Sequence, residues 1–223
     1  MSYAHHFSDQ TPAALPLGKV VCVGRNYADH ARELNNPVPD APLLFIKPAT
    51  AVVELTHPLR LPHFGGACHF EAELAVLIGS PLTRASADET LLAVAGYGLG
   101  LDLTLRELQD SLKKKGHPWE MAKAFDASCP LSPFVRPEAI ANVEDCHYTL
   151  HLNGQLQQRG ETRNMLTKVS ALLAYCSQYF TLLPGDVVLT GTPAGVGVLQ
   201  PGDQLQLALE QCLSVATEIA PNE

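Results

Sequence analysis

Two glutamates lie two residues apart in a segment that is otherwise apolar. Glu71 and Glu73 belong to the stretch CHFEAELAVLIG, residues 68–79, whose composition is typical of a buried strand. Side chains alternate along a strand, so both carboxylates point to one face, and a divalent cation would remove their mutual repulsion. A solvent-facing strand with two ordinary glutamates is the alternative. The opposite face, expected to be the core face, carries Phe70, Ala72, Leu74 and Val76.

A third carboxylate ends the next apolar strand. Asp102 closes the glycine-rich stretch 94–103, and the capping-box pattern from Thr104 to Glu107 predicts a helix immediately after it. Three carboxylates form the oxygen ligand set that Mg²⁺ or Mn²⁺ prefers, with positions left for a substrate oxygen. The alternative for Asp102 is a second helix cap. One face of the predicted helix would carry Arg106, Gln109 and Lys113.

A histidine and a glutamate share a face on a short helix near the start of the chain. His30 and Glu33 are three residues apart, in a helix that Asn26 is expected to cap. A carboxylate beside an imidazole raises its basicity and fixes its tautomer, which makes a water-activating pair. An exposed His–Glu pair without a function is the alternative reading of this spacing.

The elements that must position these residues are mostly strands. Apolar runs predict strands over 18–24, 42–48, 68–79 and 94–103, Asn153-Gly154 predicts a hairpin, and helical spacing predicts a helix over 165–180. Ser86 to Glu89 is a capping box that opens a short helix. Strands outnumber helices without regular βαβ alternation, so we expect an α+β, mainly β fold with short peripheral helices.

Composition excludes several classes of function. The net charge of −8 and the lack of a basic cluster beyond residues 113–115 argue against nucleic acid. No apolar run reaches the ~20 residues that span a bilayer, and residues 1–17 do not resemble a secretion signal. Six scattered cysteines without a CxxC pattern favour a reducing, cytoplasmic compartment. We expect an N-terminal extension over 1–17 and one domain over 18–223.

The order of several motifs resembles the fumarylacetoacetate hydrolase superfamily. These motifs are HFEAELAVLIG, GYGLGLDLTLRELQ, WEMAKAFDASCPLSPF and LPGDVVLTGTPAGVG, and GRNYADHARELN with FIKP resembles the small acylpyruvate hydrolase and oxaloacetate decarboxylase branch. The resemblance implies a mixed β-sandwich roll, a homodimer, Mg²⁺ or Mn²⁺ bound by the three carboxylates, and a mobile lid that carries His30 and Glu33. It matches Lys123 to the family's active-site lysine, while Lys47 in FIKP is a weaker candidate, readable as a surface lysine.

The resemblance and the ligand chemistry of these residues together imply a metal-dependent hydrolase of acylpyruvates, with oxaloacetate decarboxylation as a further activity of the site. His30 and Glu33 would activate water, Lys123 would stabilise the oxyanion, and the divalent ion would act as a Lewis acid. Contacts to the small 2-oxo acid substrate are expected from Arg25, Arg106, Gln109 and Thr192. One alternative is an isomerase or decarboxylase of dicarboxylic dienes, and another is a non-catalytic metal- or ligand-binding module.

Overall fold

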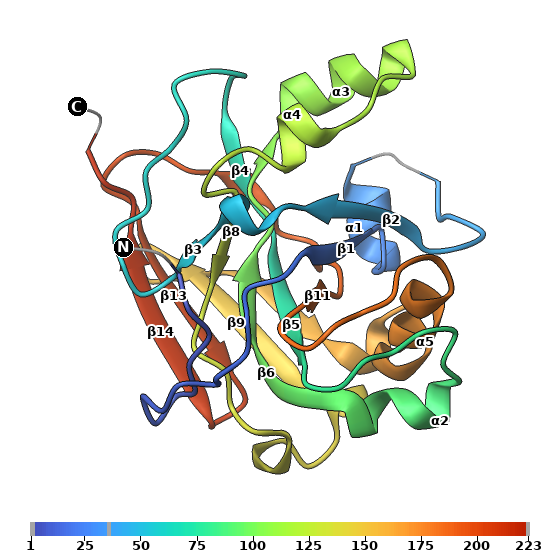
Figure 1. Ribbon diagram of the computed structural model, residues 1–223. Helices are drawn as coiled ribbons and strands as arrows, with labels where there is room; N and C mark the ends of the chain where they lie inside the picture. The colour runs from blue at the N-terminus through green and yellow to red at the C-terminus, as the bar shows by residue number, and fades with distance from the viewer. Residues whose placement is uncertain (1–2, 35–36, 222–223) are drawn as a thin grey trace.

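The structure is a computed structural model that describes residues 3–34 and 37–221. Within these residues, a seven-stranded mixed sheet forms the centre of the molecule (Figure 1). Its pairings are antiparallel except for β1 with β11 and β3 with β8, which are parallel. In sheet order the strands are β2 (Leu43–Lys47), β1 (Val20–Gly24), β11 (Val187–Leu189), β5 (Ala72–Ile78), β6 (Val94–Leu101), β8 (Cys129–Leu131) and β3 (Val52–Glu54).

Two smaller sheets pack around this centre. Leu150 and Leu207 of a four-stranded antiparallel sheet share one core with Leu74 and Leu99 of the central sheet. The four-stranded sheet has the order β10 (Gln155–Glu161), β9 (His147–Leu152), β13 (Gln204–Leu209) and β14 (Leu213–Glu218). A three-stranded sheet has the order β12 (Gly197–Val198), β4 (Cys68–Phe70) and β7 (Thr104–Leu105). The predicted mainly β, α+β class is confirmed.

The helices are short and lie at the periphery (Figure 1). The predicted capping box at Ser86 is present, with the Ser86 N–H and hydroxyl both donating to the Glu89 carboxylate at 2.8 Å. The helix predicted over 165–180 is shorter than expected. The α-helices are α1 (Ala28–Glu33), α2 (Ala87–Thr90), α3 (Arg106–Lys115), α4 (Glu120–Lys123) and α5 (Val169–Tyr179), and 3₁₀ turns cover Ala49–Ala51, Leu91–Ala93, Pro137–Ala139, Val143–Asp145 and Thr162–Asn164.

The strand predicted over 68–79 is interrupted at Glu71, which separates β4 from β5. Side chains alternate as expected, with Leu74 and Val76 in the larger core. The opposite face, however, is not open to solvent, because Ala75 and Leu77 belong to a second buried cluster on the other side of the sheet. The reading of Glu71 and Glu73 as ordinary solvent-facing glutamates is therefore wrong.

Two predicted helix caps are wrong for a common physical reason. The Asn26 side chain binds residues distant in sequence: its Nδ2 donates to Thr190 O at 2.8 Å and to Thr167 O at 3.0 Å. The Thr104 hydroxyl accepts from Lys123 Nζ at 2.7 Å, and α3 begins only at Arg106 without a side-chain cap. In both places a long-range polar contact outcompetes the local capping geometry that the sequence pattern favours. The predicted Asn153-Gly154 hairpin is present, with φ of 51° and 79°.

The N-terminal segment lies against the domain. His5 is buried and its Nε2 donates to Gly185 O at 2.9 Å, while Phe7 forms a bridge with Phe134. Tyr3, Phe7 and Leu15 pack on the second buried cluster, so residues 3–17 cover one face of the central sheet. No helix among the described residues combines the length and the apolar character needed to cross a membrane.

Candidate active site

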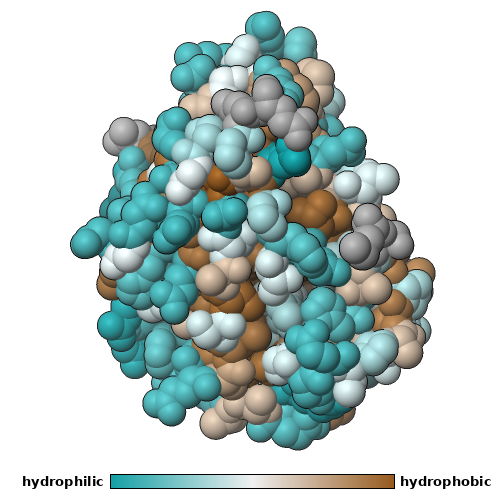
Figure 2. Space-filling model, turned by 90° about the vertical axis from the view of Figure 1, so that its left-hand side faces the viewer, coloured by the Kyte–Doolittle hydropathy of each residue, from teal (hydrophilic) through white to brown (hydrophobic). Residues whose placement is uncertain are grey.

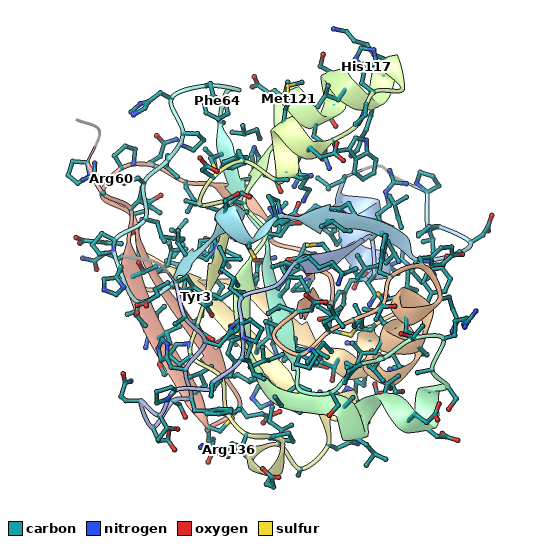
Figure 3. The ribbon with its side chains drawn as sticks, in the orientation of Figure 1. Tyr3, Arg60, Phe64, His117, Met121 and Arg136 are labelled. Atoms are coloured by element: carbon teal, nitrogen blue, oxygen red, sulfur yellow. The ribbon has the colours of Figure 1, made fainter. Side chains whose placement is uncertain are left out.

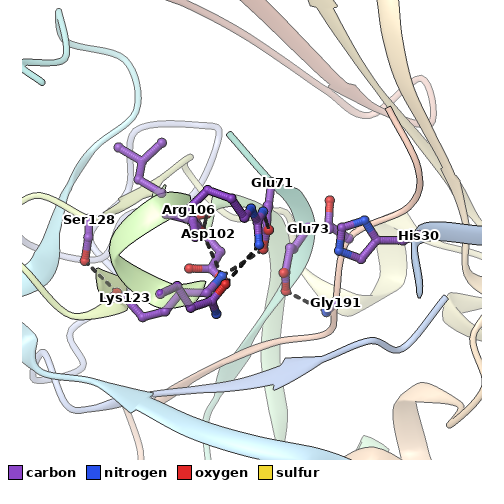
Figure 4. Close-up of polar contacts among 12 residues, drawn as sticks. His30, Glu71, Glu73, Asp102, Arg106, Lys123, Ser128 and Gly191 are labelled. Carbon is purple, nitrogen blue, oxygen red and sulfur yellow. Dashed lines mark hydrogen bonds and ion pairs between the residues drawn. The ribbon is translucent and has the colours of Figure 1, made fainter. Parts of the chain in front are cut away.

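Three buried carboxylates meet where β5 and β6 end together. The antiparallel register pairs Glu73 with Gly100 and Ala72 with Leu101, so the next residue, Asp102, lies beside Glu71. The Asp102 N–H donates to Glu71 O at 2.8 Å and locks this register. One oxygen from each of Glu71, Glu73 and Asp102 lies within 4.8 Å of the other two (Figure 4). The predicted carboxylates therefore converge, as a single bound cation requires.

Lys123 and Arg106 both contact this acid cluster. Lys123 of α4 donates from Nζ to Asp102 Oδ2 at 2.6 Å, to Thr104 Oγ1 at 2.7 Å and to Glu71 Oε2 at 2.9 Å. Arg106, in the first turn of α3, donates from Nη2 to Glu71 Oε1 and from Nη1 to Gln109 Oε1 at 3.1 Å (Figure 4). Lys123 thus donates to two carboxylates of the cluster and to the neighbouring Thr104 hydroxyl. The predicted residues Lys123, Arg106 and Gln109 are brought together with the carboxylates.

The electrostatics separate the two glutamates. Burial alone would raise the pKa of Glu71, but the charges of Lys123 and Arg106 outweigh it and lower this pKa below its usual range. Among the described residues, no ion pair is formed by Glu73. Burial, reinforced by the charges of Asp102 and Glu71, raises the pKa of Glu73 well above normal, against the hydrogen bond from Gly191 and a smaller effect of the Lys123 charge. Negative charge is therefore undercompensated at Glu73, where a cation would be favoured.

Lys47 is a site residue that sequence reasoning ranked too low. It ends β2 fully buried, with Nζ 2.8 Å from Asp102 Oδ1. The same ammonium donates to Ser128 O at 3.0 Å and Ser128 Oγ at 3.2 Å, and also to Leu103 O and Lys123 O. The reading of Lys47 as a surface lysine is wrong, since it connects β2 to the ends of β6 and α4.

The His30–Glu33 pair is formed, and α1 lies against the acid cluster. His30 is buried, and its Nδ1 lies 3.3 Å from Glu33 Oε2. Glu33 Oε1 also accepts the Gly195 N–H at 3.0 Å, so the carboxylate connects α1 to the loop after β11. Burial lowers the pKa of His30, against the opposing effects of Glu71 and Glu33, which favours a neutral imidazole. Its proton on Nδ1 leaves Nε2 as an acceptor.

The loop after β11 completes the site. The Gly191 N–H donates to Glu73 Oε2 at 2.6 Å, and Gly191 has a φ of +95°, where a Cβ would lie 2.6 Å from Asn26 Cβ. Only glycine permits this approach. The Thr192 hydroxyl donates to Ala72 O at 2.8 Å and accepts from Gln158 Nε2 at 2.8 Å. Thr192 thus holds the loop on β5, and this arrangement does not support the prediction that its hydroxyl donates to substrate.

Gln158 is a buried residue of this region that the sequence analysis did not single out. Its buried side chain accepts the Ala72 N–H at 2.9 Å and donates to Thr192 Oγ1 and Pro193 O. It follows a register shift in β10, which turns this polar side chain inward. One of three glutamines in the polar stretch QLQQRG, Gln158 carries no sign of that bulge in the sequence.

A hollow of about 420 Å³ opens above the acid cluster. Glu71, Glu73 and Lys123 line it together with His30, whereas Asp102 and Glu33 are not part of its lining. Cationic and polar groups of the wall are Arg25, Arg106, Gln109, Lys113 and Thr192, and the apolar part of the wall is Val23, Leu34, Leu43, Phe45 and Trp119. The predicted substrate-contacting residues therefore share one cavity with the acid cluster.

The three carboxylates fit a divalent cation. Asp102 Oδ1 is buried and accepts no well-directed hydrogen bond, although Lys47 Nζ is close enough for an ion pair. An all-oxygen donor set with an undercompensated glutamate suits a hard ion such as Mg²⁺ or Mn²⁺. Glu71, Glu73 and Asp102 would hold this ion.

The profile of the family "Fumarylacetoacetate (FAA) hydrolase C-terminal" matches residues 19–220, so the chain belongs to the fumarylacetoacetate hydrolase family. The chain is 49% identical over 209 residues to the oxaloacetate tautomerase YcgM of Escherichia coli (strain K12), covering 93% of this chain and 95% of that protein. The family resemblance seen in the sequence is confirmed.

Solved structures agree with the family assignment. A crystal structure from Yersinia pestis CO92, described as a fumarylacetoacetate hydrolase family protein, superposes with a TM-score of 0.95 at 47% identity, covering 97% of this chain and all of that one. The fumarylpyruvate hydrolase of Pseudomonas aeruginosa, in complex with Mn²⁺ and pyruvate, superposes with a TM-score of 0.91 at 35% identity, covering 99% and 97%. The predicted family fold is confirmed, and this Mn²⁺ complex together with the acid cluster indicates a divalent-metal site.

Proposed function

We propose that this chain is a divalent-metal-dependent enzyme that interconverts the keto and enol forms of oxaloacetate. The observation that carries the proposal is the placement of His30, a buried and neutral base, in one hollow with the acid cluster. The similarity to an oxaloacetate tautomerase at 49% identity supports the same chemistry. Oxaloacetate is a 2-oxo diacid, and the hollow offers both a cation site and basic side chains for its two carboxylates.

The chain's own residues account for the proton transfer. His30 Nε2 takes a proton from C3 of oxaloacetate and Glu33 stabilises the resulting imidazolium, while Lys123 Nζ donates a proton to the 2-oxygen; the two groups then regain their starting protonation by exchange with solvent. Arg106 and Gln109 hold a substrate carboxylate through their side-chain N–H groups. Bound at Glu71, Glu73 and Asp102, a divalent ion supplies Lewis acidity that makes the C3 proton more acidic.

A second candidate is the hydrolysis of acylpyruvates, which the His30–Glu33 pair also favours. In this reaction the pair removes a proton from water as it attacks the C4 carbonyl, and the C3–C4 bond then breaks to give the pyruvate enolate and a carboxylic acid. Oxaloacetate would give the same enolate by losing CO₂ without any water attack. The similarity to a fumarylpyruvate hydrolase supports this candidate.

A panel of substrates with Mn²⁺ tests both candidates. The enol content of oxaloacetate is followed by ultraviolet absorbance, acetylpyruvate cleavage by pyruvate release, decarboxylation by CO₂, and a dicarboxylic diene by its isomerisation. We expect the fastest metal-dependent rate for oxaloacetate tautomerisation. If metal-dependent tautomerisation is absent while acetylpyruvate is cleaved, the second candidate replaces the first. A protein that turns over none of them would be a binding module.

We also propose a homodimer, as the family resemblance implies. One face of the molecule carries a strip of apolar side chains framed by polar ones, a type of surface that mediates association (Figure 2). Light scattering after gel filtration tests the stoichiometry, and a monomeric mass would contradict it.

We propose a cytoplasmic location. All six cysteines are free thiols, as a reducing compartment would allow.

A further inference from the structure

Lys113 lines the hollow from α3, seven residues after Arg106. Arg106, which contacts Glu71, starts the polar face of this helix. Gln109 and Lys113 follow about 4.5 Å and about 10 Å further along the axis. The side chain of Lys113 is only 24% exposed, although Lys114 and Lys115 beside it are exposed. Lys113 is therefore sheltered at the outer part of the cavity wall, where the tautomerisation of oxaloacetate gives it no role.

An aromatic wall connects the acid cluster to Lys113. Lys123 Nζ lies 5.2 Å from the ring centroid of Phe45, which lies 6.3 Å from that of Trp119. The Lys113 Nζ lies 5.2 Å from the ring centroid of Trp119, the second ring of this row. The row thus runs from the acid cluster along two apolar rings to a second cation. A ligand that fits it has a 2-oxo acid head, an apolar chain and a terminal negative charge.

The nearby charges would favour an anion beside the Lys113 ammonium, because cations outnumber acids among the described residues around it. Its neighbours are Asp110 on its own helix, 3.9 Å away, and three cations: Arg106 on α3, Arg25 after β1 and Lys123 on α4. Burial lowers the pKa of Lys113 to about 8; Asp110 opposes the shift and the cations add to it. A substrate carboxylate would offset both the burial and the repulsion.

We propose that Lys113 binds the terminal carboxylate of long 2-oxo diacids, whose chain lies along Phe45 and Trp119. The inference rests on the proposed function, in which the acid cluster holds the 2-oxo acid head. The three carbon–carbon bonds of oxaloacetate span less than about 4.5 Å, which is the step from Arg106 to Gln109. A six- or seven-carbon diacid is long enough to meet the Lys113 ammonium, which leans back toward the start of the helix. The helix α3, at the edge of the molecule with His117 just beyond it, then sets the preferred length of the substrate (Figure 3).

Two stable ligands that differ only at the chain end test this assignment. 2-Oxoadipate and 2-oxohexanoate have the same head and six carbons, but end in a carboxylate and a methyl group. Dissociation constants are measured by titration calorimetry at pH 7 on the Mn²⁺-loaded protein. We expect the wild-type protein to bind 2-oxoadipate about tenfold more tightly, the scale of one charge-assisted hydrogen bond. Lys113→Met should abolish most of this preference, and Lys113→Arg should retain it.

Lys114→Met is the matched control, since it removes the same charge from an exposed position of the same helix. It should leave the ratio of the two dissociation constants at the wild-type value. Lys113→Gln keeps a long polar chain and replaces Lys113→Met if that variant is misfolded by circular dichroism. If the ratio of the two dissociation constants is the same in the wild-type protein and in Lys113→Met or Lys113→Gln, the role of Lys113 is overturned and the proposed function is not affected. A wild-type protein that binds neither ligand also overturns the binding of the 2-oxo acid group at the acid cluster, and with it the proposed function.

Discussion

Lys47 and Asp102 form an ion pair that is closed to solvent, with Nζ 2.8 Å from Oδ1 and less than 3% of either side chain exposed. Without Lys47, Asp102 keeps Lys123 as its only ion-pair partner among the described residues, and Ser128 O and Leu103 O lose this donor; leaving a buried acceptor unpaired typically costs about 1–3 kcal/mol. Lys47→Met should therefore lower the free energy of unfolding by about that amount in urea titrations with EDTA. The double variant Lys47→Met/Asp102→Asn should recover part of the loss.

Lys114→Met is a suitable control for this cycle, because it removes a lysine charge at an exposed position. We expect it to change the free energy of unfolding by less than about 0.5 kcal/mol. A Lys47→Met protein as stable as the control would mean that the pair makes no net contribution. The double variant would not be fully restored, since Ser128 O and Leu103 O also lose their donor.

A metal ion should stabilise the protein through Glu73. Mn²⁺ at about a hundred times its dissociation constant adds about 2.7 kcal/mol of stability, which raises the Tm by roughly 5–10 °C in a domain of this size. In Glu73→Gln most of this shift should disappear. With EDTA the variant should melt no lower than wild type at neutral pH, because burial and the charges of Asp102 and Glu71 disfavour the Glu73 carboxylate. Glu138→Gln, at an exposed position, should keep the full Mn²⁺ shift in scanning calorimetry.

Long diacids should bind less tightly at alkaline pH. Lys113 has a pKa lowered to about 8, first by burial, so it is cationic below this pH and neutral above it. The ligand carboxylates stay ionised throughout. The preference for 2-oxoadipate over 2-oxohexanoate should thus be complete near pH 7 and fall as the pH rises through about 8 toward 9.5. Lys113→Arg should show a flat profile because the guanidinium keeps its charge. A wild-type ratio independent of pH would remove Lys113 from ligand binding.

The carboxylates of the site were predictable from sequence, and their lysine partners only in part. Alternation along residues 68–79 places Glu71 and Glu73 on one face, and the antiparallel partner strand places Asp102 beside them. Lys47 carries no such signal, because its partners Leu103 O, Lys123 O and Ser128 come from segments remote in sequence. The two wrong caps, Asn26 and Thr104, failed for the same reason: their side chains serve contacts that only the tertiary fold creates.

The His30–Glu33 pair should separate the reactions that the site can perform. Tautomerisation needs a base at C3 and acylpyruvate hydrolysis needs an activated water, whereas decarboxylation of oxaloacetate needs only an electron sink. His30→Ala should therefore lower the first two rates by about 10²–10⁴-fold and decarboxylation much less. Glu33→Gln should act in the same direction with a smaller effect, because Gln can still accept a hydrogen bond from the Nδ1–H of His30. The three rates are compared at saturating Mn²⁺.

Arg32→Ala is the control for damage to α1, since Arg32 is exposed and its ion pair with Asp29 is at the surface. It should leave the ratios of the three rates unchanged. If His30→Ala lowers all three by the same factor, the histidine is not a proton-transfer group. The pair would then act by holding α1 against the loop at Gly195, where Glu33 Oε1 accepts the backbone N–H at 3.0 Å, and Glu33→Gln should reproduce the uniform loss.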